Sequence, residues 1–189
     1  MATWTDNFNR TNENPLAVPW TKLAGGNCIL ASNNVVEDAG GSSWYYYNTA
    51  TPGANQYAQI KQSAGDAGPA VRMATAATTC YTLYENGAST AYKLVRFNAG
   101  ADTDLIEDLP MPGSGVTIKL EVTGVGATVT LNVYYNNVLQ DTYADTDAAR
   151  IVAAGKIGFY LYGYNDLDDW EGGDLGGAVA SKIIMANWI

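Results

Sequence analysis

Apolar and polar side chains alternate along most of this chain, and that period of two limits its fold more than any other feature. In the segment 116–123, valine, isoleucine and leucine fall on one face, and threonine, lysine and glutamate fall on the other. The segment 128–135 alternates in the same way. Such segments form half-buried antiparallel strands whose apolar face lies on a core.

Short strand-like segments of this kind recur and end at Gly, Asn, Asp or Pro. Asn136-Asn137 and Asn86-Gly87 each fit a tight hairpin turn, because these residues tolerate the positive φ that such turns require. Only the segment 145–152 favours a helical turn. The rhythm predicts an all-β, two-sheet antiparallel jelly-roll β-sandwich over residues 1–177, with a C-terminal extension over 178–189.

Charge and hydropathy exclude two classes of partner. The formal net charge is −9 and the sequence pI is near 4.2, with ten basic residues scattered singly. Binding to nucleic acid or to an anionic membrane surface requires clustered Lys and Arg, so both are poor candidates. No apolar run approaches the roughly 18 residues that a membrane span requires.

The ends of the chain and its cysteines bear on its compartment. Met1-Ala2-Thr3-Trp4 lacks the basic and apolar regions of a secretory signal, which predicts synthesis in a cytoplasm, or secretion if a leader has been removed. Cys28 and Cys80 permit one bridge. The alternative, two buried reduced thiols, is favoured because no signal is present.

Several kinds of catalytic and cofactor site are disfavoured by the residues present. The chain has no histidine, so a nucleophilic triad lacks its usual base. It has no glycine-rich phosphate loop between a strand and a helix, and no cofactor signature. We therefore expect no catalytic residues and no certain cofactor.

The order of the segments resembles the concanavalin A-like lectin/glucanase superfamily, in its laminin-G-like, single-domain bacterial and phage form. The resemblance covers about residues 4–175. It implies two curved, stacked antiparallel sheets, with the first and last strands side by side and a ligand on the concave sheet. It is carried by Asp6-Asn7-Phe8-Asn9-Arg10 with Trp20, and by the segments 68–73, 84–87, 116–141, 155–160 and 167–171.

Two groups of aromatic residues are candidates for stacking on the apolar C–H faces of a sugar. One is Trp44, Tyr45 and Tyr47; the other is Tyr160 and Tyr162, which would line the concave sheet. The alternative interpretation of the first group is structural. In that case Trp44 and Tyr46 fill the core, and the other two tyrosines pair across strands.

An acidic segment near the end of the sandwich is a candidate calcium site, since calcium binds carboxylate and carbonyl oxygens and lectin relatives carry calcium near a sandwich rim. Its members are Asp166, Asp168, Asp169 and Glu171. Strict alternation would place Asp169 and Glu171 on one face, and Asp168 and Trp170 on the other. The alternatives are a solvated rim or, least favoured, catalysis, because the Glu-x-Asp-x-x-Glu motif of glucan-cleaving relatives is absent.

The segment 178–189 is apolar and carries a single charge. An exposed apolar segment needs a partner. It would fold back as an extra edge strand, or reach a neighbouring subunit as an exchanged arm. The residues that would make this contact are Val179, Ile183, Ile184, Trp188 and Ile189.

Three functions follow from these observations. The first is a non-enzymatic surface protein of a bacteriophage virion, a capsid decoration or tail-associated protein that adheres to glycans, with virion subunits or its own copies, such as a trimer, as partners. The second is a free-standing carbohydrate-binding module or lectin-like domain. The third, a glycan-cleaving hydrolase or lyase, ranks last.

Overall fold

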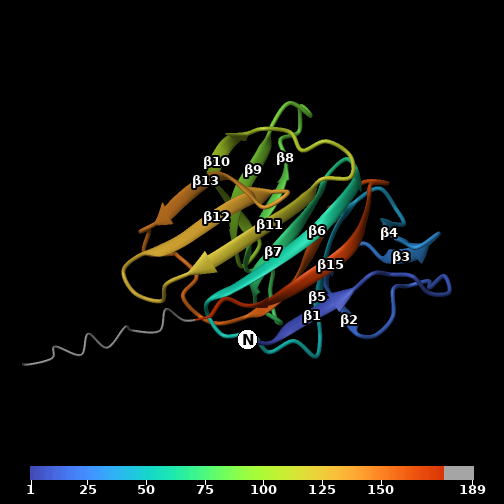
Figure 1. Ribbon diagram of the computed structural model, residues 1–189, viewed down its shortest axis with the longest axis horizontal. Helices are drawn as coiled ribbons and strands as arrows, with labels where there is room; N and C mark the ends of the chain where they lie inside the picture. The colour runs from blue at the N-terminus through green and yellow to red at the C-terminus, as the bar shows by residue number, and fades with distance from the viewer. Residues whose placement is uncertain (177–189) are drawn as a thin grey trace, which may run out of the picture.

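The computed structural model describes residues 1–176 and consists of fifteen strands in two antiparallel sheets (Figure 1). This confirms the all-β two-sheet sandwich. The described residues contain no helix, so they include none long and apolar enough to cross a membrane. The helical turn expected at 145–152 is instead a strand end at Asp145 and a turn closed from Arg150 N to Asp147 O (3.2 Å).

Sheet A faces the viewer in Figure 1 and contains the first and last strands, which pair with each other. Its strands run in the order β13 (Val138–Asp145), β12 (Val129–Tyr135), β11 (Thr117–Thr123), β6 (Gln56–Ala64), β15 (Asp166–Asp174), β4 (Asn34–Glu37) and β3 (Cys28–Ala31), with β1 (Thr3–Asp6) beside β15. The Asn136-Asn137 hairpin turn between β12 and β13 has positive φ at both residues (49° and 64°), as predicted.

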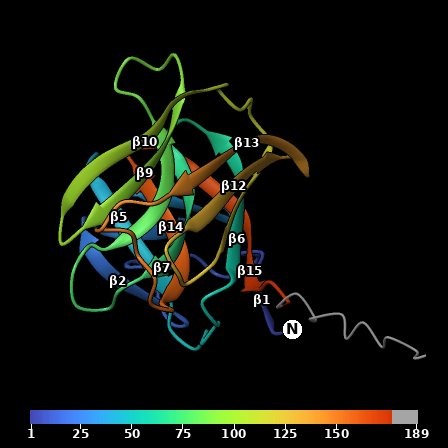
Figure 2. The same cartoon turned by 90° about the vertical axis from the view of Figure 1, so that its left-hand side faces the viewer.

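Sheet B lies behind sheet A and is seen from the side in Figure 2. Its strands run in the order β10 (Ala101–Leu109), β9 (Tyr92–Asn98), β8 (Cys80–Glu85), β7 (Ala67–Met73), β14 (Lys156–Tyr162), β5 (Ser42–Tyr47) and β2 (Trp20–Gly25). All seven residues of β7 are buried, which shows that the middle of this sheet is covered on both faces.

Aromatic rings fill the space between the sheets at one flank. Trp20 of sheet B meets Trp170 of sheet A edge-on, with ring centroids 4.9 Å apart. Tyr47 stacks on the same Trp170 ring at 5.0 Å, and Phe159 lies 4.8 Å from Trp20. Such pairs add about 0.5–1.5 kcal/mol each beyond the apolar area that they bury.

A buried ion pair joins the sheets at the other flank. Arg96 of β9 donates from Nη1 to both carboxylate oxygens of Asp145 of β13, at 3.0 and 2.9 Å. The two side chains are 5% and 1% exposed. The Tyr81 hydroxyl also donates to Asp145 Oδ2 (2.7 Å) and accepts from Ile151 N (2.8 Å). The carboxylate is thus hydrogen-bonded from several sides, which offsets its desolvation.

A second buried arginine, Arg72, holds three loops together. Its guanidinium donates only to main-chain carbonyls: Ala54 O (3.0 and 2.8 Å), Gly124 O (2.6 Å) and Ile151 O. The side chain is 1% exposed, and burial lowers its pKa. Each of these carbonyls is an acceptor that the loops do not satisfy by themselves, so this one side chain supports the end of the sandwich where all three loops meet.

Cys28 and Cys80 are both buried and free, in agreement with the reduced interpretation. Cys28 belongs to the core between the sheets, and Cys80 to a second cluster on the outer face of sheet B. Burial raises the pKa of each thiol to about 12, so both are protonated and unreactive at neutral pH.

We expect Asp145→Asn to lower the free energy of unfolding by about 3–5 kcal/mol, because it removes the buried counter-charge of Arg96. The remaining carboxylate, Asp147, is 58% exposed and lies 3.7 Å from Arg96 Nη2. The double variant Arg96→Met, Asp145→Leu should recover part of that loss, since it removes both charges. Chemical denaturation measures both values. A double variant that is less stable than the single one would show that the charges themselves stabilise the fold.

Replacing Arg72 by lysine should destabilise the protein by about 3 kcal/mol, because one ammonium group cannot reach all three carbonyls and each orphaned buried acceptor costs about 1–3 kcal/mol. Arg150→Lys is the matched control, since Arg150 also donates only to carbonyls, those of Gly126 and Asp147, but at the surface. Denaturation midpoints compare the two. Equal losses would contradict the role given to Arg72.

Candidate functional site

The four aromatic residues of β5 alternate, but in the opposite phase to the structural interpretation of the sequence. Tyr45 and Tyr47 point between the sheets, where Tyr45 is 2% exposed and stacks on Phe159. Trp44 and Tyr46 lie on the outer face of sheet B. The placement of Trp44 and Tyr46 in the core is therefore a wrong prediction, and Tyr45 and Tyr47 are the core residues.

The outer face of sheet B carries a second apolar group, here called the outer cluster. Its rings come from both flanks of the sheet and meet over the middle. Trp44 of β5 and Phe97 of β9 have centroids 5.5 Å apart, although four inter-strand steps of about 4.8 Å separate their strands in a flat sheet. The outer cluster consists of Tyr46, Ala70, Met73, Cys80, Val95 and Phe97, with Leu23, Trp44 and Tyr84 packed against it.

This convergence depends on curvature and on small residues in the middle of the sheet. Gly68 pairs with Tyr160, and Gly158 pairs with Ala70, so two glycines and an alanine lie between the flanking rings. A Cβ on Gly68 would lie 1.8 Å from the carbonyl oxygen of Leu83. The middle of this face is consequently filled by protein side chains, and it leaves little ring surface for a ligand.

Tyr160 and Tyr162 follow one another on the outer face of β14 but have different environments. Tyr160 is 5% exposed and packs on Trp44 (5.0 Å) and Tyr84 (5.4 Å), so it belongs with the filled part of the face. Tyr162 is 46% exposed and lines a pocket at the end of the sheet. Of the five predicted stacking residues, Tyr162 presents the most accessible ring beside a cavity.

That pocket, here called the polar pocket, has a volume of about 190 Å³. Three turns form it: the β6–β7 turn, the β8–β9 hairpin and the β14–β15 turn. Because β8, β7 and β14 are neighbours in sheet B, their adjoining ends hold the turns close together. The lining residues are Asp66, Glu85, Asn86, Gly87, Ser89, Tyr162 and Asn165.

Asp66 is the most constrained group in the polar pocket. It is 7% exposed, and its Oδ1 accepts a hydrogen bond from Glu85 N at 2.8 Å. Oδ2 has no hydrogen-bond partner among residues 1–176. Burial raises the pKa of this carboxyl to about 7, against the lowering effect of the Glu85 N–H bond. A nearly buried carboxylate with an unused acceptor oxygen is suited to a ligand that donates hydrogen bonds.

Asn165 closes the polar pocket beside Asp66. Its Nδ2 donates to Tyr162 O at 2.7 Å, and its side chain lies directly over Gly65. Gly65 has φ +70°, and a Cβ there would lie 1.7 Å from Asn165 Oδ1. Only glycine accommodates both the backbone and the close approach.

Sequence reasoning missed most of this site: it named Tyr162 but not Asp66, Glu85, Ser89 or Asn165. The available signal was the set of turn residues at strand ends, Gly65-Asp66, Asn86-Gly87 and Asn165. Strands β7 and β8 are consecutive, but β14 follows β8 only after five further strands, so nothing in the sequence places Asn165 beside the other two turns.

The acidic strand β15 does not alternate as expected. Its pairing with β6 shifts register between Asp168 and Glu171, and Asp169 has φ +45°. Leu167 and Trp170, three residues apart, therefore both enter the core. This β-bulge places Asp168 on the opposite face from Trp170, which corrects the prediction that the two share a face.

The four carboxylates of β15 have separate environments. Asn34 Nδ2 donates to Asp166 (3.2 Å), Lys61 Nζ lies 3.4 Å from Asp169, and the Tyr57 hydroxyl donates to Glu171 (2.6 Å). Burial raises the pKa of Asp168. Within residues 1–176, no three or more Asp, Glu, Cys or His side chains are placed to hold one metal ion, so the structure does not bring the predicted calcium ligands together.

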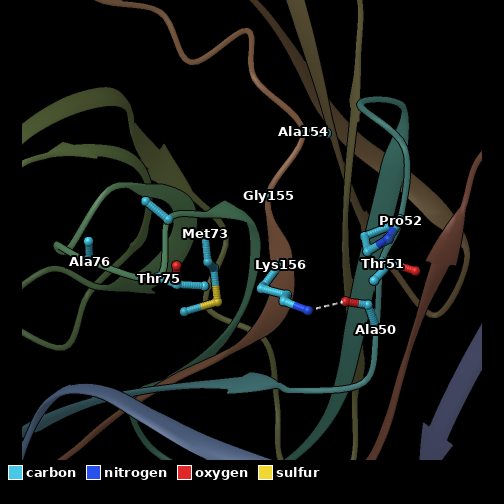
Figure 3. A pocket seen from close by; sticks show the side chains of 10 residues that line it. Ala50, Thr51, Pro52, Met73, Thr75, Ala76, Ala154, Gly155 and Lys156 are labelled. Atoms are coloured by element: carbon cyan, nitrogen blue, oxygen red, sulfur yellow. Dashed lines mark hydrogen bonds between the residues drawn. The ribbon is translucent and has the colours of Figure 1, made fainter.

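An apolar hollow of about 480 Å³ lies at the opposite end of sheet B (Figure 3). Lys156 contributes its carbon chain to the wall, while its Nζ is bonded to Ala50 O and Asn48 O, both at 2.7 Å. The hollow is lined by Ala50, Thr51, Pro52, Met73, Ala74, Thr75, Ala76, Ala154, Gly155 and Lys156. Its scarcity of free polar side chains makes it a poor site for a hydroxyl-rich ligand.

The proposed arm residues Val179, Ile183, Ile184, Trp188 and Ile189 lie outside the described residues, as does the predicted boundary between 177 and 178. Both predictions for this segment, an extra edge strand and an intersubunit arm, therefore stay predictions.

No family model and no curated protein match this chain. Solved structures match its fold at low identity. A carbohydrate binding module from Bacillus subtilis is 14% identical, with a TM-score of 0.57 over 80% of this chain and 91% of that one. A legume lectin-like domain from Entamoeba histolytica is 10% identical, with a TM-score of 0.53 over 83% and 90%.

The Ca2+/Man2-bound form of the VIP36 exoplasmic/lumenal domain is 8% identical, with a TM-score of 0.58 over 93% of this chain and 88% of that one. Identities this low bear on the fold alone. The chain has the concanavalin A-like lectin fold that its sequence segments predict.

Proposed function

We propose that this chain is a non-enzymatic, lectin-like domain that binds a sugar in the polar pocket. The single observation that carries the proposal is the pairing of Asp66, whose Oδ2 is unused, with the exposed ring of Tyr162 around one cavity. A sugar ring presents hydroxyl groups at its edge and C–H bonds on its faces. The carboxylate suits the hydroxyls, and the ring suits a C–H face.

The rigidity of the support favours this pocket over the rest of the outer face. The polar pocket stands on the ends of three neighbouring strands of sheet B, and precise sites are better held by strands than by long loops. The solved structures with this fold include proteins described as a carbohydrate binding module and as a Ca2+/Man3GlcNAc-bound domain. That likeness supports the sugar proposal without naming the sugar.

Other parts of the sequence prediction rank lower. Some neighbours are enzymes, among them a transglycosylase and a xylosidase, but the Glu-x-Asp-x-x-Glu motif of glucan-cleaving relatives is absent from this sequence. Calcium is proposed only by analogy with the Ca2+-bound neighbours. The virion-surface role draws in part on the segment 178–189, which lies outside the described residues. It ranks as the second proposal, and a free-standing binding domain is preferred.

Removing the Tyr162 ring tests the sugar proposal. We expect Tyr162→Ala to weaken binding to the best ligand from a glycan array about tenfold. A tenfold rise in the dissociation constant corresponds to a loss of about 1.4 kcal/mol, which lies within the range that aromatic stacking contributes. Calorimetric titration of the purified chain gives the dissociation constants.

Tyr164→Ala is the matched control, because Tyr164 is 77% exposed, lies two residues away and does not line the polar pocket. Its affinity should stay unchanged, and both variants should unfold within about 0.5 kcal/mol of the parent. Equal loss of binding in both variants, or in neither, would place the sugar elsewhere.

The burial of Asp66 also predicts a pH effect on stability. The folded-state pKa near 7 lies above the ordinary value of 3.8, so the folded state holds this proton more tightly than the unfolded state. Its contribution to stability is complete below about pH 3.8 and is lost as pH rises through about 7. At about 1.4 kcal/mol per pKa unit, the loss is on the order of 4 kcal/mol.

Asp66→Asn should remove that slope, because the amide keeps an acceptor for Glu85 N and carries no charge. Denaturation of both proteins between about pH 4 and pH 8 measures the difference and cancels the other titrating groups. Parallel curves would mean that the Asp66 carboxyl is solvated, and that Oδ2 is not held ready for a ligand.

A further inference from the structure

The polar pocket is acidic and has no compensating cation in its wall. Two carboxylates, Asp66 and Glu85, line it, and none of its lining residues is Lys or Arg. Lys93, on the neighbouring strand β9, is already held by Asp104 at 2.7 Å. A charged group entering the pocket therefore meets a negative potential that no lining side chain neutralises.

The hydrogen-bonding groups of the polar pocket are mainly acceptors. Asp66 Oδ2 has no partner among the described residues. Asn165 uses one N–H of Nδ2 on Tyr162 O, which leaves Oδ1 as an acceptor and the second N–H as a donor. The Asn86 amide is turned to its own hairpin: Oδ1 accepts from Thr90 N (3.0 Å) and Nδ2 donates to Thr90 Oγ1 (3.1 Å). The Ser89 and Tyr162 hydroxyls can donate or accept, whereas an ionised carboxylate only accepts, so a ligand that donates hydrogen bonds fits this pocket best.

From this arrangement we infer that the polar pocket selects single sugar units by charge, taking amine-bearing sugars most tightly, uncharged sugars less tightly, and excluding uronic and other anionic sugars. This inference rests on the proposed function and specifies its ligand class. An ammonium or hydroxyl group donates hydrogen bonds, whereas a sugar carboxylate only accepts them. The carboxylate would also be repelled by Asp66 and Glu85.

The size of the pocket limits the ligand to one ring. A volume of about 190 Å³ is below the roughly 300–1,000 Å³ of sites that enclose a drug-sized ligand. A terminal or single sugar unit is therefore the part that enters. A charged substituent on that ring would lie near both lining carboxylates, Asp66 and Glu85.

The test uses the full chain and a matched series of sugars. Methyl glycosides of glucose, galactose and mannose, each with a hydroxyl, an amine or a carboxylate at C6, are titrated by NMR at about pH 8, where Asp66 is ionised. We expect the amine form of the binding sugar to be at least threefold tighter than the hydroxyl form. The carboxylate form should be at least tenfold weaker than the hydroxyl form.

Glu85→Gln should reduce both the preference for the amine form over the hydroxyl form and the penalty on the carboxylate form, because it removes one of the two lining charges. Asp141→Asn is the matched control: it makes the same change in net charge on the exposed edge strand β13 of the other sheet, and should leave the order unchanged. Added salt should reduce the amine preference, as expected for a charge effect.

The outcomes separate the two proposals. A carboxylate form that binds as well as the hydroxyl form, or an order that Asp141→Asn changes as much as Glu85→Gln, would overturn the charge selection and leave sugar binding intact. Failure of every sugar form to shift a resonance, together with an empty glycan array, would overturn the proposed function and the selection with it.

Discussion

Contacts that cross the space between the two sheets determine how this sandwich is assembled. At one flank Trp170 of sheet A is held by Trp20 and Tyr47 of sheet B. At the other flank the Arg96–Asp145 pair makes the connection. The aromatic contact tolerates small shifts, whereas the ion pair requires a fixed geometry because both charges are desolvated. Together they set the spacing of the sheets and the relative position of their strand ends.

The polar pocket depends mainly on sheet B, because its three turns stand at the adjoining ends of β7, β8 and β14. Sheet B is covered on both faces, by the core on one and by the outer cluster on the other. Its middle strands consequently have little conformational freedom, and they hold the turns at the ends of β7, β8 and β14 in fixed positions. A small cavity lined by turn residues is thus supported by the most buried part of the molecule, although the cavity itself is at the surface.

The sequence predicts the sandwich well where each strand has one apolar face, as in β11 and β12, whose alternating burial matches the pattern of their residues. It fails where that condition is absent. In β5 both faces are covered, so four consecutive aromatic residues do not reveal which pair points inward. In β15 the bulge at Asp168-Asp169 changes the phase of the strand, and single-sequence alternation contains no signal for it.

Asp66 shows a third reason why the sequence does not predict part of the structure. In the sequence, Gly65-Asp66 resembles any solvated turn between two strands. Its burial comes from residues that are distant along the chain, such as Tyr92, whose hydroxyl bonds to the carbonyls of Gly65 and Ala67. The environment that raises the pKa of the carboxyl is therefore a property of the assembled sheets. The sequence also predicts sugar stacking by five aromatic residues, but four of those rings, all except Tyr162, pack against other rings.

The strand β6 spans the molecule from the polar pocket to the end where Met1 and Leu175 lie. Its last residue precedes the turn that carries Asp66, and its first follows Asn55, whose carbonyl accepts a hydrogen bond from Leu175 N. Nine residues at about 3.3 Å each separate those ends by roughly 30 Å. Met1 lies beside Gly176, at the same end as Leu175. A molecule attached near Met1 or Gly176 would therefore contact the end of the sandwich that lies opposite the polar pocket, and would leave the pocket accessible.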